Sequence, residues 1–373
     1  MTKQLTVIQL LPALNSGGVE RGTTEIAHAL VKAGHRSIVI SAGGRLVEQL
    51  EREGTEHITL PIGEKHLSTF KYIWQLRKIF REIKPDIIHL RSRLPAWMGY
   101  LAWKKLPKTN RPHVVTTVHG PYSVNWYSAV MTKGERVIAV SEMIKGYITH
   151  NYPKVNANNI TVIHRGVDTD RYNQDYRADS SWQEQWQKDF PQLTGKLVLT
   201  LPARITAWKG QDDFINCIRA LKEKGLSIHG LIVGETHPRK QDYLTKLTDR
   251  VAELGLNNEV TFTGHRSDIQ NILSVSDLVF SLAKQPEAFG RTTIEALSMG
   301  IPVIGYNHGG VAEQLNTLLP EGLVEVNDVN SVINKVVAWQ QSPPTVAIEH
   351  PFTLHNLCDK TLSVYDALCS SDN

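Results

Sequence analysis

Two carboxylates with seven residues between them, Glu287 and Glu295, flank a Phe-Gly-Arg turn at 289–291. The apolar run 277–282 before them is typical of a buried parallel strand. The stretch 291–299 has the composition of a helix. Glu287 is therefore expected at the carboxyl end of a strand, and Glu295 about two turns into the next helix. Backbone amides at the start of that helix would point toward an anionic ligand.

Two cations on one loop form a second candidate group. Arg204 and Lys209 follow the apolar run 197–201 and precede a helical segment at 211–224. Cations at a helix N-terminus suit a diphosphate, and they would bind a leaving diphosphate more strongly as it gains charge. The alternative interpretation is ordinary surface charge.

Paired glycines, Gly17 and Gly18, follow the first apolar strand and open a long helical segment. Glycines let a phosphate approach the backbone closely, and a helix N-terminus favours negative charge. The spacing is not G-x-G-x-x-G, which disfavours a nicotinamide oxidoreductase. His119 ends another strand, and a glycine-rich turn at 305–310 is a candidate wall of the same ligand site.

A further cationic segment carries Arg91, Arg93 and Trp97 directly after a strand. These side chains could receive an anionic sugar or phospholipid acceptor, or they could belong to an exposed loop. The neighbouring segment 67–83 has apolar residues at helical spacing, with five Lys or Arg residues between and just after them. We expect a helix that turns its apolar side to the core; the alternative is a basic face docked on anionic lipid.

Composition limits the class of protein. The 373 residues are 41% apolar and 21% charged, which suits two globular domains. Three unpatterned cysteines, Cys217, Cys358 and Cys369, predict neither disulfides nor a zinc site and fit a reducing compartment. Residues 1–168 hold 23 Lys or Arg against 12 Asp or Glu, net +11, while the remainder is −7. Because no nucleic-acid motif is present, an anionic membrane surface or lipid is the better partner for the basic part.

Short apolar segments alternate with helical segments, as in doubly wound α/β sheets. The alternation stops over the polar stretch 169–194, which we interpret as a linker with one short helix, and then resumes. The expected strands are 5–11, 37–41, 57–60, 86–90, 114–119, 137–141, 160–163, 197–201, 231–233, 260–263, 278–282, 303–305 and 323–325. The expected helices include 19–33, 67–83, 211–224, 240–254, 269–275 and 292–299.

These motifs, in this order along the chain, resemble those of the retaining glycosyltransferases of family 4, which have the GT-B fold. The resemblance implies two Rossmann-like doubly wound α/β domains that face each other across a deep cleft. It places an acceptor-binding domain at 1–168, a linker at 169–194 and a nucleotide-sugar-binding domain at 195–352. The final helix, about 353–373, would pack back on the first domain.

The resemblance also assigns roles to the candidate residues. The first Glu of the family lies against the donor sugar and the second holds the ribose, roles that fall on Glu287 and Glu295. Arg204 and Lys209 would stabilise the departing diphosphate, and His119 would reach the sugar or its phosphate. The other implied donor contacts are Gly17, Gly18, Gly234, Arg266, Phe289, Gly290 and Arg291. Uracil, guanine and adenine all remain compatible with the base site.

No cofactor is implied beyond the donor substrate. Asp168-Thr169-Asp170 looks like an Asp-x-Asp metal site, but that motif belongs to another glycosyltransferase architecture, so no metal is expected. The implied partners are a nucleotide-sugar donor, a glycan or lipid-linked acceptor and an anionic membrane surface, with no nucleic acid.

The implied activity is retaining transfer of a hexose-type sugar, in the synthesis of bacterial lipopolysaccharide or surface polysaccharide. The protein would be cytoplasmic or peripheral on the inner face of the membrane. The alternatives are a sucrose- or trehalose-type synthase, a non-hydrolysing nucleotide-sugar epimerase and a catalytically silent GT-B module. The intact set of Glu287, Arg204 and Lys209 argues against a silent module.

Overall fold

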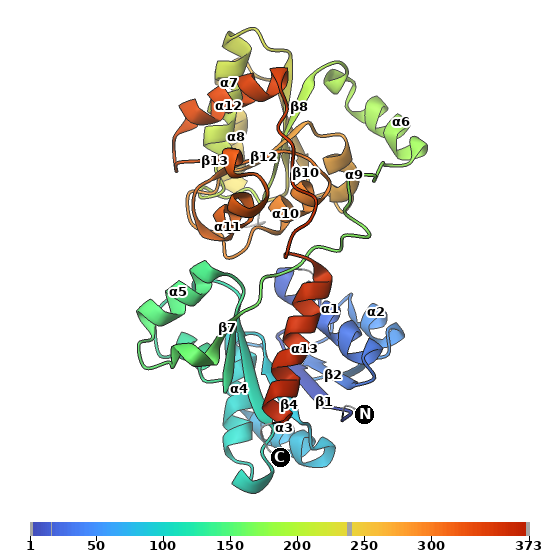
Figure 1. Ribbon diagram of the computed structural model, residues 1–373, viewed down its shortest axis with the longest axis vertical. Helices are drawn as coiled ribbons and strands as arrows, with labels where there is room; N and C mark the ends of the chain where they lie inside the picture. The colour runs from blue at the N-terminus through green and yellow to red at the C-terminus, as the bar shows by residue number, and fades with distance from the viewer. Residues whose placement is uncertain (1–2, 16, 237–240, 371–373) are drawn as a thin grey trace. The chain divides into compact units, whose positions relative to one another are not determined.

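The computed structural model describes residues 3–15, 17–236 and 241–370, and the chain forms two compact units. Unit 1 comprises residues 1–165 and 354–373, and unit 2 comprises residues 166–353. Each unit is built on one parallel sheet with helices packed against it (Figure 1). All the strands expected from the sequence are present within a few residues of the expected bounds.

The sheet of unit 1 has the strand order β3-β2-β1-β4-β5-β6-β7. Its strands are β1 (Thr6–Leu10), β2 (Arg36–Ser41), β3 (Glu56–Thr59), β4 (Ile87–Leu90), β5 (His113–Val118), β6 (Arg136–Ala139) and β7 (Ile160–Val162). The order reverses between β1 and β4. Because open α/β sheets bind ligands at such a switch point, the loops after these two strands are the first place to look for a site.

Helices cover both faces of this sheet. α1 (Gly18–Lys32) and α13 (Leu354–Ser370) lie side by side on one face, and α4 (Arg93–Lys104) packs on the other, where Gly99 lies against Leu10 and Leu90 (Figure 1). The remaining helices of unit 1 are α2 (Val47–Arg52), α3 (Tyr72–Ile83) and α5 (Glu142–Asn151).

The C-terminal helix α13 is held in unit 1 by its buried side. Cys358, Tyr365 and Leu368 join a core with residues of α1 and the sheet. The hydroxyl of Tyr365 lies 2.6 Å from Nδ1 of His89, and Thr117 lies 2.6 Å from Nε2 of the same fully buried ring. Burial holds the pKa of His89 well below its usual value, so the ring is neutral. The last part of the expected helix, 371–373, lies outside the described residues.

The sheet of unit 2 has the order β10-β9-β8-β11-β12-β13, which reverses between β8 and β11. Its strands are β8 (Leu197–Pro202), β9 (Ile228–Val233), β10 (Val260–Gly264), β11 (Leu278–Ser281), β12 (Val303–Tyr306) and β13 (Leu323–Val324). Its helices are α6 (Ser180–Asp189), α7 (Gln211–Glu223), α8 (Gln241–Glu253), α9 (Ile269–Ser274), α10 (Arg291–Ser298), α11 (Gly309–Leu318) and α12 (Val329–Gln341). The expected first residue of α8, Lys240, lies outside the described residues.

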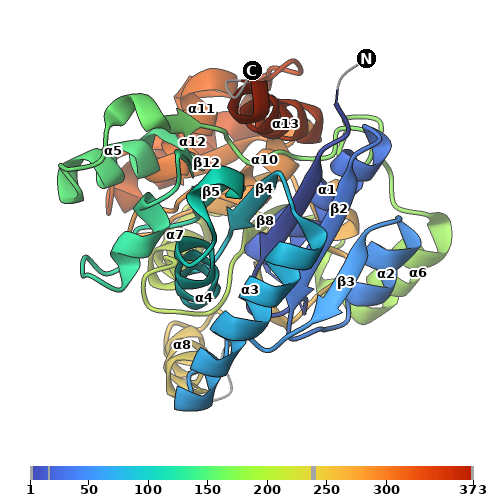
Figure 2. The same cartoon turned by 90° about the horizontal axis from the view of Figure 1, so that it is seen from below.

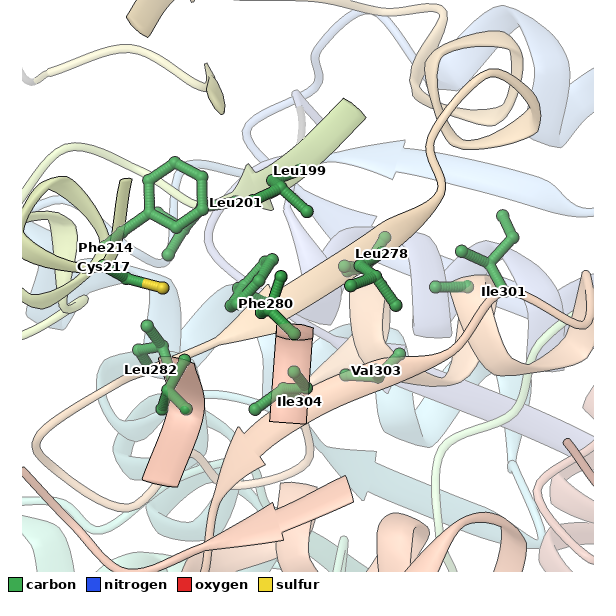
Figure 3. Packing of buried hydrophobic residues seen from close by; sticks show 14 of the residues in the cluster. Leu199, Leu201, Phe214, Cys217, Leu278, Phe280, Leu282, Ile301, Val303 and Ile304 are labelled. Atoms are coloured by element: carbon green, nitrogen blue, oxygen red, sulfur yellow. The ribbon is translucent and has the colours of Figure 1, made fainter. Parts of the chain in front are cut away.

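The core of unit 2 joins the strands on either side of the switch point. Leu199 of β8, Phe280 of β11 and Ile304 of β12 are almost fully buried in one core cluster with Phe214 of α7 (Figure 3). The rings of Phe214 and Phe280 meet edge to face, with centroids 5.1 Å apart. This packing fixes the strand ends from which the candidate site loops emerge.

The segment expected to be a linker, 169–194, belongs to unit 2 instead. It contains α6, in which the rings of Trp182 and Trp186 stack with centroids 4.9 Å apart. The ring of Phe190, directly after the helix, lies tilted against Trp186 at 4.3 Å. Trp186 and Leu193 are buried against the sheet. Most residues of the segment face solvent and are polar, so its sequence resembles that of a linker. The few aromatic residues that bury it are four apart, on one side of the helix.

The expectation for 67–83 was wrong for its first half. The segment forms a 3-10 helix, η1 (Leu67–Lys71), that continues into α3. Leu76 and Phe80 are buried, but Leu67, Phe70 and Trp74 are exposed. The apolar residues are spread around more of the helix than the side that packs on the core. Some of them therefore face solvent. None of the described helices is both long and apolar enough to span a bilayer.

We expect Tyr365→Phe to lower the free energy of unfolding by about 1–3 kcal/mol, because it leaves Nδ1 of buried His89 without its partner. Urea denaturation of the purified chain measures the change. The control is Asp366→Asn, an exposed neighbour on α13, which should leave the midpoint unchanged. Equal midpoints for Tyr365→Phe and wild type would contradict a stabilising role for this contact.

Candidate active site

Two loops of unit 2 meet backbone to backbone at the switch point between β8 and β11. The amide of Lys284 donates a 2.7 Å hydrogen bond to the carbonyl of Trp208. Gly210 has a φ of 81°, and a Cβ at that position would lie 2.0 Å from the carbonyl oxygen of Leu282. Only glycine fits this approach. The contact fixes the loop after β8 against the loop after β11.

The joined loops bring together two residues that the sequence placed in one site. Nζ of Lys209 lies 2.7 Å from Oε1 of Glu287, and the two side chains are only 13% and 21% exposed. Nζ also lies 4.5 Å from the ring centroid of Trp208, over its face. Glu287 is the one carboxylate partner of this ammonium among the described residues. A partly shielded ammonium can exchange such a partner for a phosphate oxygen.

Arg204 lies on the same loop, with its side chain exposed. Its carbonyl accepts a 3.0 Å hydrogen bond from the side chain of buried Gln211 at the start of α7. Gly234, at the end of β9, has a φ of 152°, and a Cβ there would lie 2.2 Å from the carbonyl oxygen of Ala203. Gly234 therefore packs against the backbone of the Arg204 loop. Its contact with the donor stays a prediction.

Glu295 lies about one turn into its helix, not two. Gly290 adopts the left-handed conformation and caps α10, which begins at Arg291. Nε of Arg291 lies 3.7 Å from Oε1 of Glu295, and Glu295 is 3% exposed. The helix begins at Arg291, as expected, and Glu295 is its fifth residue. The expectation of two turns was wrong because it counted the residues from Glu287 rather than from the start of the helix. The side chain of Phe289 is in the core against Phe352, so only its backbone is available to a ligand.

The helix α11 supports the Glu287 loop from the other side. The amide of Gly310 donates a 2.8 Å hydrogen bond to the carbonyl of Glu287, and Gln314 donates one of 2.6 Å to the carbonyl of Phe289. A Cβ on Gly309 or Gly310 would lie 2.6 Å or less from atoms of this loop. The sequence indicated the glycine-rich turn but not Gln314, a fully buried polar residue on an otherwise apolar helix side. These residues position Glu287, and the predicted contact of the glycine-rich turn with a ligand stays a prediction.

The side chain of Arg266 is used by the fold. Its Nε and Nη2 donate to the two carboxylate oxygens of Asp268 at 2.9 and 2.5 Å, and the guanidinium lies over the ring of Trp186. Burial raises the pKa of Asp268, but hydrogen bonds from Arg266 and Trp182 outweigh it, so the pKa is below its usual value. Through Trp182 and Trp186, this ion pair holds α6 against the loop between β10 and α9. The side chain of Arg266 is therefore engaged within unit 2. The predicted contact with the donor remains a prediction for the backbone of this residue.

In unit 1, the loops after β1 and β4 also converge. Gly17 caps α1 with a φ of 145°, and a Cβ on Gly18 would lie 2.1 Å from Nη1 of Arg165. Nη2 of Arg165 lies 3.0 Å from Nδ1 of His119. A cavity of about 20 Å³, room for one water molecule, is lined by Gly18, Gly22, His89, Arg91, His119 and Arg165 together with apolar residues.

Buried polar atoms face this cavity. Arg91 is 5% exposed, and its Nη1 donates to Gln9 at 3.2 Å, while its Nε has no hydrogen-bond partner among the described residues. Nε2 of His119 is likewise buried without a partner in the described part of the chain. Burial, with nearby Arg165 and Arg91, holds the pKa of His119 well below its usual value. The ring is therefore neutral, and with Arg91 it can offer hydrogen bonds to an anionic group.

The other two predicted acceptor residues lie in an aromatic setting. The guanidinium of Arg93 lies 4.8 Å from the ring centroid of Tyr122 and 5.5 Å from that of Tyr127. Nε1 of Trp97 donates to the carbonyl of Tyr127 at 2.8 Å. Both side chains are thus held by local contacts in unit 1, and their contact with an acceptor stays a prediction.

Comparison with known proteins decides the family. The chain matches the profiles described as Glycosyltransferase Family 4, over residues 16–171, and Glycosyl transferases group 1, over residues 183–347. A glycosyltransferase from Rickettsia africae of known crystal structure is 31% identical, with 98% of each chain covered and a TM-score of 0.85. The chain belongs to glycosyltransferase family 4. The predicted GT-B class, with two Rossmann-like units, is confirmed.

The chain is also similar to other proteins. Anabaena Alr3699/HepE, solved in complex with UDP-glucose, has a TM-score of 0.81 at 20% identity, with 98% of this chain and 100% of that chain covered. The lipopolysaccharide core mannosyltransferase LpsB of Rhizobium meliloti is 24% identical over 63% of each chain. The chain thus spans less than two thirds of the length of LpsB, and only 26% of another curated relative.

We expect the stability of this protein to fall as the pH drops from about 7 to 5. An unfolded histidine titrates near pH 6.5, whereas folded His89 and His119 resist protonation, so each adds up to about 1.4 kcal/mol per pH unit. Urea denaturation at several pH values measures the slope. His119→Asn should make the slope shallower, and exposed His355→Gln should not. An unchanged slope in His119→Asn would contradict a neutral buried His119.

Proposed function

We propose that this chain transfers a hexose-type sugar from a nucleoside-diphosphate sugar to a glycan or lipid-linked acceptor, with retention of anomeric configuration. The observation that carries the proposal is the Lys209–Glu287 pair, held 2.7 Å apart where two glycine-fixed loops meet. This pair lies close to the starts of α7 and α10, whose first amides favour an anion.

In the proposed reaction the diphosphate takes Glu287's place at Lys209. The released carboxylate of Glu287 then accepts hydrogen bonds from hydroxyls of the donor sugar. As the bond between the anomeric carbon and the diphosphate oxygen breaks, negative charge grows on the diphosphate. Lys209, Arg204 and the amides of 289–291 stabilise that charge more in the transition state than in the ground state.

Retention is proposed to follow from attack on the same face that the diphosphate leaves. The acceptor hydroxyl oxygen forms the new glycosidic bond, and its proton passes to an oxygen of the departing diphosphate. The mechanism needs no protein general base, no metal and no cofactor, and Glu295 would hold the ribose of the nucleotide.

The relatives suggest which substrates to test first. HepE was solved with UDP-glucose, and LpsB is named as a mannosyltransferase of the lipopolysaccharide core. UDP- and GDP-hexoses are therefore the first donors to try. The basic N-terminal part, net +11 over residues 1–168, supports an anionic acceptor such as a lipopolysaccharide precursor, with Arg91 as a contact. The protein would act in the cytoplasm, on the inner face of the membrane.

We expect Lys209→Met to lower the turnover number by about 10²-fold or more, because it removes a cation from the leaving group. Steady-state release of nucleoside diphosphate measures it, with an acceptor extract as second substrate. The control is Lys224→Met, which changes an exposed lysine at the far end of α7.

The folded state of both variants is checked by melting temperature. Near wild-type turnover in Lys209→Met would exclude the proposed role of this residue. A wild-type chain that consumes no nucleotide sugar with any acceptor would instead favour a catalytically silent module. Product with inverted configuration, read by NMR coupling of the anomeric proton, would overturn retention.

A further inference from the structure

A row of apolar side chains on unit 1 is left uncovered by the fold. Leu67, Phe70 and Trp74 are 84%, 52% and 73% exposed. Their spacing of three and four residues places them on one side of the η1–α3 segment. Leu76 and Phe80 are on the opposite side and buried. α3 packs against α4, beside which it lies in Figure 2. The exposed row is therefore on the side of the helix that the fold does not cover.

The same outward side is strongly basic. Lys71, Lys78 and Arg81 are exposed and lie three residues before, four after and seven after Trp74. Residues 65–84 contain six Lys or Arg and a single carboxylate, Glu82. That carboxylate lies 3.8 Å from Lys78, and both side chains are more than half exposed, so the pair neutralises little. No other ion pair of these cations occurs among the described residues.

We propose that this surface, Leu67, Phe70 and Trp74 with Lys71, Lys78 and Arg81, docks unit 1 on an anionic lipid bilayer. Apolar side chains interleaved with cations on one helix side match the boundary between lipid headgroups and acyl chains. Tryptophan is favoured at that depth because its ring is apolar and its N–H reaches water. The cations meet the anionic headgroups.

The charge pattern favours a lipid surface over a protein partner. A protein interface is usually depleted of lysine, whereas this surface holds several lysines around its apolar row. A bilayer needs no matching shape, only negative charge over an area and an apolar layer beneath it. Docking at a bilayer would bring unit 1 close to the lipid-linked acceptor of the proposed function. Only this biological purpose of the surface rests on the proposed function. Vesicle binding itself is independent of catalysis.

Sedimentation with vesicles tests the inference. The full chain is mixed with vesicles of phosphatidylcholine alone, or with a third of the lipid replaced by phosphatidylglycerol. The expected result is binding to the anionic vesicles that weakens with added salt, because the charges are exposed. Phe70→Ser with Trp74→Ser should weaken the partition coefficient by about tenfold or more. Lys71→Glu with Lys78→Glu should weaken it similarly.

The control variants change matched residues in unit 2. Ile348 is 70% exposed, so Ile348→Ser is the apolar control. Lys188→Glu with Lys224→Glu repeats the charge reversal on exposed lysines. Both controls should bind as the wild type does. Absence of wild-type binding, or equal losses in the control variants, would overturn the proposal.

Turnover separates this inference from the proposed function. If the docking variants lose vesicle binding but keep donor consumption with a detergent-dispersed acceptor, the docking surface is supported as a separate feature. If the wild type binds anionic vesicles but consumes no donor, the docking surface stands and the transferase proposal fails. Phe70→Ser/Trp74→Ser binding vesicles as tightly as the wild type would exclude this surface.

Discussion

The candidate site depends on one close backbone approach, that of Gly210 to the carbonyl of Leu282. Any side chain at Gly210 would separate the loop after β8 from the loop after β11. With the loops joined, Lys209 and Glu287 lie 2.7 Å apart. The α11 turn then holds the Glu287 carbonyl through the amide of Gly310. The charged side chains are therefore positioned by backbone contacts, which are stiffer than side-chain contacts and cost little entropy when a ligand binds.

Unit 1 repeats this arrangement with different chemistry. Its switch point brings Gly18 and Arg91 to one cavity, where His119 and Arg165 also lie. Burial and the guanidinium groups of Arg165 and Arg91 lower the pKa of His119, so its ring stays neutral. The cavity thus combines fixed positive charge with a hydrogen-bonding group that does not titrate near pH 7. These side chains suit an anionic group of a ligand, because their charge and hydrogen-bonding capacity stay constant near pH 7.

Much of the fold could be predicted from the sequence because buried parallel strands are short apolar runs that alternate with helical segments. Lys209 and Glu287 each lie in a loop after such a run, and the resemblance to family 4 is what placed them in one site. Two features were not accessible. The packed rings of Trp182, Trp186 and Phe190 make α6 part of unit 2, but their polar neighbours suggested a linker. The 67–83 pattern has more apolar residues than one buried side holds, and periodicity alone cannot say which of them stay exposed. Gln314 was missed because its partner is a distant backbone carbonyl.

The most direct test of the account is calorimetric titration of the chain with UDP, GDP and ADP, repeated with Lys209→Met. The account predicts that one nucleoside diphosphate binds the wild type, and that its affinity falls about tenfold or more in the variant, as for loss of one charge-assisted contact. The corresponding nucleoside, which has no phosphate, should bind wild type and variant equally. Equal affinity of the diphosphate for both proteins, or no binding of any diphosphate to the wild type, would contradict the claim that the Lys209–Glu287 pair marks the donor site.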